Sequence, residues 1–112
     1  MREYPKWSEL PEIDLYLDQV LEYVNKLHSP VMLKNDKGLT SAMINNYVKN
    51  HYVDKPIKKK YSRRQLARLI VITYLKNVFS IQEISKTLTM LTKNDKSEIM
   101  YNNFVACMNG ED

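Results

Sequence analysis

The stretch from Leu39 to Tyr61 reads LTSAMINNYVKNHYVDKPIKKKY and carries the clearest local structural signals in the sequence. Thr40 is a favourable N-cap, because its hydroxyl can accept a hydrogen bond from a free N–H group of the first helical turn. Apolar side chains then recur at spacings of three and four residues, so they share one face of a helix. These are Met43, Ile44, Tyr47 and Val48. The stretch therefore predicts a helix over residues 40–50 with one buried face.

The remaining face of this predicted helix carries short polar side chains and a cation. They are Ser41, Asn45, Asn46 and Lys49. Amides, hydroxyls and cations suit the base edges and phosphates of DNA. After the helix, Pro56 interrupts the helical pattern and Lys58–Lys60 concentrates positive charge. A polar helix face followed at once by a basic turn predicts a DNA-reading element.

Length and composition favour one small helical domain. The chain has 112 residues, of which 44% are hydrophobic and 27% charged, a balance typical of a folded protein. With two glycines and four prolines it has few turn formers, which favours helices. No run approaches the roughly 18 apolar residues of a membrane span, and the first ten residues lack the apolar centre of a signal peptide. We therefore expect a cytoplasmic protein.

Charge is segregated along the sequence. Residues 1–24 carry two cations and six anions, residues 25–92 carry thirteen and three, and residues 93–112 carry two and four. The middle of the chain therefore has a net charge of +10 between acidic ends, although the whole chain is only +4. A concentrated basic region of this kind is the electrostatic signature expected of a nucleic-acid-binding face.

Helical periodicity also marks the two ends of the chain. An apolar stripe at Ile13, Leu17, Val20, Leu21, Val24 and Leu27 predicts an N-terminal helix over about 11–27. This stripe serves either the core or a dimer seam. Trp7 either folds back onto the domain or anchors a partner. Ser29–Leu33 can form a short helix, and residues 35–38 form a turn.

Capping signals divide the second half of the chain. Ser62 with Gln65 and Ser80 with Glu83 are capping boxes, each followed by an amphipathic run. Asp95 with Glu98 repeats the signature and predicts a C-terminal helix over about 95–109. We expect a single domain over 1–112, with a core over about 30–92. The cations in the first turns of the helix after Ser62 are unfavourable for its dipole, which suggests a nearby phosphate.

The region from residue 38 to residue 84 resembles the DNA-binding domain of MerR-type regulators. The family's glycine, apolar residue and cap correspond to Gly38-Leu39-Thr40, and Ile44 and Tyr47 match its recognition helix. Tyr52-Val53, Pro56 and Lys58–Tyr61 follow the order of its wing. Leu66, Leu69 and Ile72 fill the apolar places of the next helix, and Phe79–Ile84 resembles its next capped turn. The pattern is closer still to a small bacterial family of domains of unknown function described as MerR-like.

The resemblance implies a mainly α fold, a MerR-like winged helix-turn-helix, with extra N-terminal and C-terminal helices. Asn45 and Lys59 stand where the family has arginines, so the family's base preference does not carry over. The family's long dimerisation helix and effector domain have no counterpart in the sequence. Effector sensing by the family's route is therefore not implied.

Catalytic and metal-binding patterns are weak. His28 and His51 are far apart, and Cys107 is the single cysteine, which we expect to be a small buried apolar residue. The sequence shows no phosphate-binding glycine loop, no HExxH and no nucleophile elbow. We expect no enzymatic activity and no cofactor.

The sequence therefore predicts a sequence-specific DNA-binding transcriptional regulator, with a recognition helix over 40–50 and a basic wing over 55–61. The expected contacts to DNA are Ser41, Asn45, Asn46, Lys49, Lys55, Lys58, Lys59, Lys60, Tyr61, Arg63 and Arg64. Tyr47 is either a core anchor or a phosphate contact. The expected partners are double-stranded DNA and a second copy bound through Ile13–Leu27 or Ile99–Met108. The alternatives are a protein-interaction module on the same scaffold and, less favoured, a non-specific RNA binder.

Overall fold

The computed structural model describes residues 4–28 and 38–110, and this part of the chain is mainly helical with a small two-stranded sheet. Its elements in chain order are η1 (Trp7–Glu9), β1 (Leu15–Tyr16), α1 (Leu17–His28), α2 (Ser41–Lys49), β2 (Lys60–Tyr61), α3 (Arg63–Leu75), α4 (Ile81–Leu91) and α5 (Ser97–Met108). The mainly α prediction is confirmed. The short helix predicted within 29–33 lies outside the described residues, as does most of the turn at 35–38.

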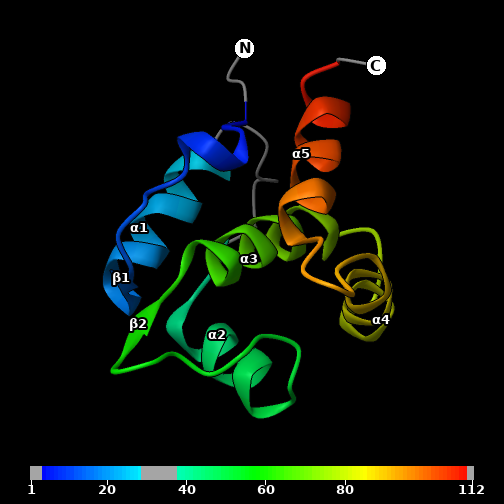
Figure 1. The fold of residues 1–112 in the computed structure, drawn as a ribbon. Helices are drawn as coiled ribbons and strands as arrows, with labels where there is room; N and C mark the ends of the chain where they lie inside the picture. The colour runs from blue at the N-terminus through cyan, green and yellow to red at the C-terminus, as the bar shows by residue number, and fades with distance from the viewer. Residues whose placement is uncertain (1–3, 29–37, 111–112) are drawn as a thin grey trace.

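Helix α3 runs through the middle of the molecule, and α1 and α5 both pack against it (Figure 1). Leu66, Leu69, Ile70 and Ile72 on α3 are at most 1% exposed. The sequence places apolar residues nearly all round this helix, which is the pattern of a helix contacted from several sides. Helices α1, α4 and α5 and strand β2 all pack against it. The core of the described part is therefore built around α3.

The N-terminal helix begins later than predicted. Residues 11–14 are not helical, and Leu15–Tyr16 forms strand β1, which pairs antiparallel with β2 so that Leu15 lies opposite Tyr61. Helix α1 therefore starts at Leu17, and Ile13 is 71% exposed instead of buried. Pairing with a strand distant in sequence holds residues 15–16 extended. Val20 and Val24 are fully buried, so the apolar stripe of α1 serves the core.

Three of the predicted helix caps are confirmed and one is wrong. The Thr40 hydroxyl accepts from the backbone N–H of Met43 (3.2 Å), and the capping boxes that begin at Ser62 and Ser80 both form. Asp95, by contrast, lies in a turn with a left-handed φ of 61°, and α5 begins after Lys96 without a side-chain cap. The box between Asp95 and Glu98 therefore does not form.

The first described residues fold back onto α5. The Trp7 ring packs edge-on against Tyr101 at 6.2 Å between centroids, and the Tyr101 hydroxyl donates to the Pro5 carbonyl (2.8 Å). The prediction that Trp7 folds back onto the domain is confirmed. Cys107, on the last turn of α5, is exposed, so its predicted burial is wrong. Across residues 4–28 and 38–110, every helix is too short or too polar to span a lipid bilayer.

The elements that carry the predicted DNA contacts lie at the other end of the molecule. In Figure 1, η1 and the end of α5 are at the top, whereas α2 and the loop leading into β2 are at the bottom. The chain between α2 and β2, residues 50–59, contains a connector (residues 50–56) and a tight turn. The N-terminal segment and α5 therefore pack together at one end of the molecule, and α2 lies at the opposite end.

Candidate nucleic-acid interface

Helix α2 presents a polar face to solvent, as its sequence predicts. Ile44 and Tyr47 are buried, at 0% and 6% exposed, and burial raises the pKa of the Tyr47 hydroxyl. Tyr47 is therefore a core anchor. The predicted contact residues of this helix are all exposed: Ser41, Asn45, Asn46 and Lys49.

Ala42 belongs to the same exposed face, and the sequence reasoning missed it. At 100° per residue, Ala42 and Lys49 point almost directly away from Ile44 and Tyr47, and Asn45 and Asn46 lie on either side of them. Helical spacing alone places Ala42 on this face. It was missed because only polar residues were considered as contacts. A small side chain at the centre of the face lets the helix backbone approach a surface closely.

The two adjacent asparagines of α2 differ in their hydrogen bonds. The side-chain amide of Asn50 donates to Oδ1 and to the backbone carbonyl of Asn46, so the Asn46 oxygen already has a partner. Asn45 is exposed, and none of the described residues hydrogen-bonds to its side chain. Asn45 therefore offers both an amide donor and a carbonyl acceptor to a ligand.

The tight turn at Ile57–Lys60, called the hairpin below, places two lysines at its tip. Ile57 and Lys60 exchange two backbone hydrogen bonds, of 3.0 and 2.9 Å. Lys58 and Lys59 between them have φ of 51° and 67°. Positive φ at both central residues is the signature of a type I′ turn, which normally takes Asn-Gly. The chain instead holds two exposed cations in a backbone conformation that costs a side-chain-bearing residue roughly 1 kcal/mol.

Gln65 and Arg68 on α3 fix the connector between α2 and the hairpin. The Gln65 amide donates to the carbonyls of Asp54 and Lys55 (2.9 Å each), and Arg68 Nε donates to the Tyr52 carbonyl (2.6 Å). No local pattern in the sequence predicts these bonds, which together form a brace, because each joins residues ten to sixteen apart that do not share an element. The hydrogen bond to the Tyr52 carbonyl gives Arg68 a structural role near the start of α3, apart from any contact with DNA.

Asn25 of α1 fixes the residues just before the start of α2. Its side-chain amide donates to the Leu39 carbonyl and its oxygen accepts from the Leu39 N–H, both at 2.8 Å. Lys76 of α3 also donates to the Gly38 carbonyl (2.8 Å). The residues just before the Thr40 cap are therefore tied to both α1 and α3, and α2 is fixed at its beginning as well as beyond its end.

The structure does not gather all of the predicted contact residues. Tyr61 is 4% exposed and belongs to the core, and burial raises its pKa, so its ring is not available to DNA. Arg63 approaches the Trp7 ring (6.0 Å to its centroid) and the Pro11 carbonyl. Arg64 instead reaches Asp95 at 3.9 Å, at the turn before α5. Consecutive helical positions differ by 100°, so these two arginines diverge and do not brace the hairpin.

The cations that remain lie on α2, the connector and the hairpin. Lys49, Lys55, Lys58 and Lys59 are exposed. Lys60 is partly covered, because its ammonium lies over the Tyr16 ring of β1 at 5.2 Å from the centroid. The predicted wing is thus represented by lysines alone, without Arg63, Arg64 or Tyr61.

A family model described as a domain of unknown function, DUF1836, matches residues 5–104. The chain belongs to the DUF1836 family. The matched residues of this DUF1836 domain include α2, the connector, the hairpin and the bracing residues of α3. No curated protein and no solved structure matches the chain.

Proposed function

We propose that this DUF1836 domain is a sequence-specific DNA-binding transcriptional regulator with a MerR-like winged helix-turn-helix. Helix α2 is the proposed recognition helix, and the hairpin is the proposed wing. The observation that carries the proposal is the joint presentation of the polar α2 face and the dilysine tip. Both are held to α3, through a connector bound by Gln65 and Arg68. Preorganised contacts of this kind favour recognition, because less ordering is required on binding.

In this mode α2 enters the major groove with its exposed face toward the bases. Asn45 has a free donor and acceptor, the pair that recognises adenine through its N6 and N7 groups. Ala42, beside it, suits apolar contact with a thymine methyl group. We therefore propose that the site read by α2 contains A·T pairs.

The wing supplies affinity rather than sequence information. Lys55, Lys58 and Lys59 are exposed. Lys55 lies on the connector, whose backbone is held by α3, and Lys58 and Lys59 form the tip of the hairpin that follows. Lysine contacts to phosphates release counterions from DNA, which makes binding salt-dependent. The strained backbone at the tip supports a functional role, because left-handed lysines persist only where the surrounding structure holds them.

A second copy of the chain is the proposed protein partner. The stripe within Ile13–Leu27 is used by the core, so we favour the surface of α5 that begins at Ile99. Ile99 is 59% exposed and Leu91 53%, and both line an apolar groove of about 390 Å³ between α3, α4 and α5. Two copies would place two α2 helices on one DNA site, the usual arrangement for helix-turn-helix proteins. Sedimentation showing a monomer at high concentration, unchanged by Ile99→Glu, would refute this interface.

The first experiment is the salt dependence of binding to random duplex DNA, for the wild type and for Lys58→Ala/Lys59→Ala/Lys60→Ala. With about five phosphates contacted, the log–log slope is expected to be roughly −4 to −5, and the triple variant should reduce its magnitude by up to about 3. A weak and flat response in both proteins would refute DNA binding.

Base reading is tested separately by selecting preferred sequences from random duplexes. Asn45→Ala should lose discrimination at one position, worth about 1–3 kcal/mol, with little change in salt slope. Lys55→Ala is the matched control, because it should weaken binding to all sequences equally. Identical sequence preferences for the wild type and Asn45→Ala would refute the proposed role of Asn45.

The alternative function is a protein-interaction module. This alternative is supported by several large apolar side chains that are exposed to solvent. Ile57 on the hairpin is 76% exposed and Val78 after α3 is 73% exposed. The divergence of Arg63 and Arg64 also reduces the charge available beside the hairpin. If duplex DNA does not bind, these apolar positions are the ones to mutate in a search for a protein partner.

A further inference from the structure

A polar cavity of about 290 Å³ lies between the connector and helices α3, α4 and α5, beside the brace that fixes the connector. Its wall includes His51 and Asp54 of the connector, Arg64 and Arg68 of α3, and Thr89 of α4. Two guanidinium groups line the cavity against a single carboxylate, so it is net positive even when His51 is neutral.

Arg68 brings an incompletely paired charge to this cavity. Its Nη2 donates to Ser85 Oγ and the Ser85 carbonyl (3.4 and 3.3 Å) and to Thr89 Oγ1 (3.2 Å), all neutral acceptors. Nη1 of Arg68 makes no hydrogen bond to a described residue. It is not fully buried, so solvent reaches it. The Asp54 carboxylate compensates part of this desolvated charge, whereas the neighbouring Arg64 repels it. A bound anion would add compensation that the neutral hydrogen-bond acceptors do not supply.

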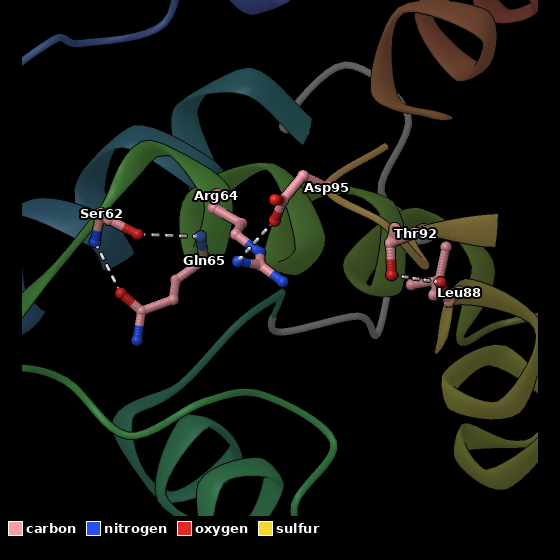
Figure 2. A network of polar contacts seen from close by, with 6 residues as sticks. All are labelled: Ser62, Arg64, Gln65, Leu88, Thr92 and Asp95. Carbon is pink, nitrogen blue, oxygen red and sulfur yellow. Dashed lines mark hydrogen bonds and ion pairs between the residues drawn. The ribbon is translucent and has the colours of Figure 1, made fainter. Parts of the chain in front are cut away.

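Arg64 can join Arg68 in binding such an anion. Figure 2 shows its side chain extending from α3 toward Asp95. The contact to Asp95 is long (3.9 Å), and both side chains are more than half exposed, so the ion pair is weak and readily exchanged. The guanidinium of Arg64 is therefore available to a ligand in the cavity.

The hydroxyls at the wall have different capacities. Thr92 donates its proton to the Leu88 carbonyl (2.7 Å, Figure 2), so it offers only an acceptor. Thr89 accepts from Arg68, which leaves its own proton free to donate. The lining residues that retain hydrogen-bond donors for a ligand thus include Arg64, Arg68 and Thr89.

We propose that this cavity binds a small oxyanion, a carboxylate or phosphate compound, through Arg64, Arg68 Nη1 and Thr89. Guanidinium groups suit the paired oxygens of these anions, which they bind by charge-assisted hydrogen bonds. Asp54 at the wall limits the net positive charge and so favours a singly or doubly charged group.

Occupation of the cavity has a consequence for α2 that rests on the proposed function. The ligand would join α3 and α4 beside the connector, whose Tyr52 carbonyl is already bound by Arg68. It would therefore stiffen the segment that sets the hairpin relative to α2, and the anion would change the affinity for DNA. The binding site itself does not depend on this consequence.

The test follows backbone amide signals by NMR while inorganic phosphate replaces chloride at constant ionic strength. We expect saturable shifts at residues 51–54, 64–68 and 89–92. Arg64→Gln should weaken phosphate binding at least about tenfold, since it removes a charged hydrogen-bond donor. Lys93→Gln is the matched control, because it removes an exposed cation that does not line the cavity. Arg68→Lys, which keeps the charge but loses the fork, should weaken binding as well.

Non-saturating shifts spread over the lysines, or equal affinity in the wild type and Arg64→Gln, would overturn the proposal. A parallel titration with short duplex DNA separates this site from the proposed function. If DNA shifts the cavity amides and phosphate does not, the cavity binds the nucleic-acid backbone and the small-anion proposal is wrong. If phosphate binds and DNA does not, the anion site stands and the DNA-binding function fails.

Discussion

The hairpin tip allows backbone strain and charge to be changed independently. Lys58 and Lys59 occupy the two left-handed positions of the turn, at φ 51° and 67°. The double variant Lys58→Asn/Lys59→Gly gives the turn the residues that its geometry favours. It also removes two exposed positive charges.

The expected gain in stability follows from the two strained residues. Each left-handed lysine costs roughly 1 kcal/mol, and the glycine loses about 0.5–1 kcal/mol of this gain through the greater freedom of the unfolded chain. The net increase in the free energy of unfolding should be about 1 kcal/mol, or about 4 °C in melting temperature for a domain of this size. Urea and thermal denaturation followed by circular dichroism would measure it.

The same variant should bind DNA less tightly. Losing two phosphate contacts lowers the magnitude of the log–log salt slope by about 1.8, at roughly 0.9 per contact. A protein that is more stable yet binds DNA more weakly cannot be explained by partial unfolding. The opposite combination, with stability lowered and slope unchanged, would refute both the turn assignment and the phosphate contacts.

Two controls separate the effects. Lys58→Ala/Lys59→Ala removes the same charges but keeps side chains in the left-handed region, so its salt slope should fall without the gain in stability. Lys6→Asn/Lys93→Asn removes two exposed cations from outside α2, the connector and the hairpin, so its slope should stay close to that of the wild type. An equal loss of slope in this last variant would indicate that only total charge matters.

Three further predictions concern the residues that hold α2 and the connector in place, and the N-terminal segment that packs against α5. Arg68→Gln should lower the free energy of unfolding by about 2 kcal/mol in urea denaturation, because it breaks charged hydrogen bonds to the Tyr52 carbonyl and to α4; no loss would refute the brace. Asn25→Ala removes both hydrogen bonds to Leu39 and should cost about 1–2 kcal/mol in the same assay, and an unchanged stability would refute this role of Asn25. Burial raises the pKa of Tyr4 to about 12 from its ordinary value of 10. The folded state therefore keeps this proton longer, so stability should be unaffected by Tyr4 below pH 10 and should fall as pH rises from 10 through 12, which denaturant midpoints across that range would show. Tyr4→Phe should make this decline shallower.

Local signals in the sequence were sufficient to place most helices. Thr40, Ser62 and Ser80 cap the helices that they were expected to cap, because a cap bonds to residues only three positions away. The buried face of α2 likewise follows from helical spacing, since Ile44 and Tyr47 lie one turn apart.

The failures share a different physical cause. Ile13 is exposed and α1 begins late, because Leu15 pairs with Tyr61, forty-six residues away, and this pairing has no local signature. Aspartate is a favourable helix N-cap, but the turn after α4 holds Asp95 in a left-handed backbone conformation.

For the candidate site, the residue types follow from the amino-acid sequence: the polar face of α2 and the lysines after it. Their roles depend on packing between distant parts of the chain. In the folded protein Tyr61 is buried, and Arg63 and Arg64 contact different neighbours. Gln65 and Arg68 hold the connector through hydrogen bonds to its backbone. Helix caps and periodicity depend on neighbours within one turn, whereas the direction of a long side chain depends on partners brought near by the packing of α3.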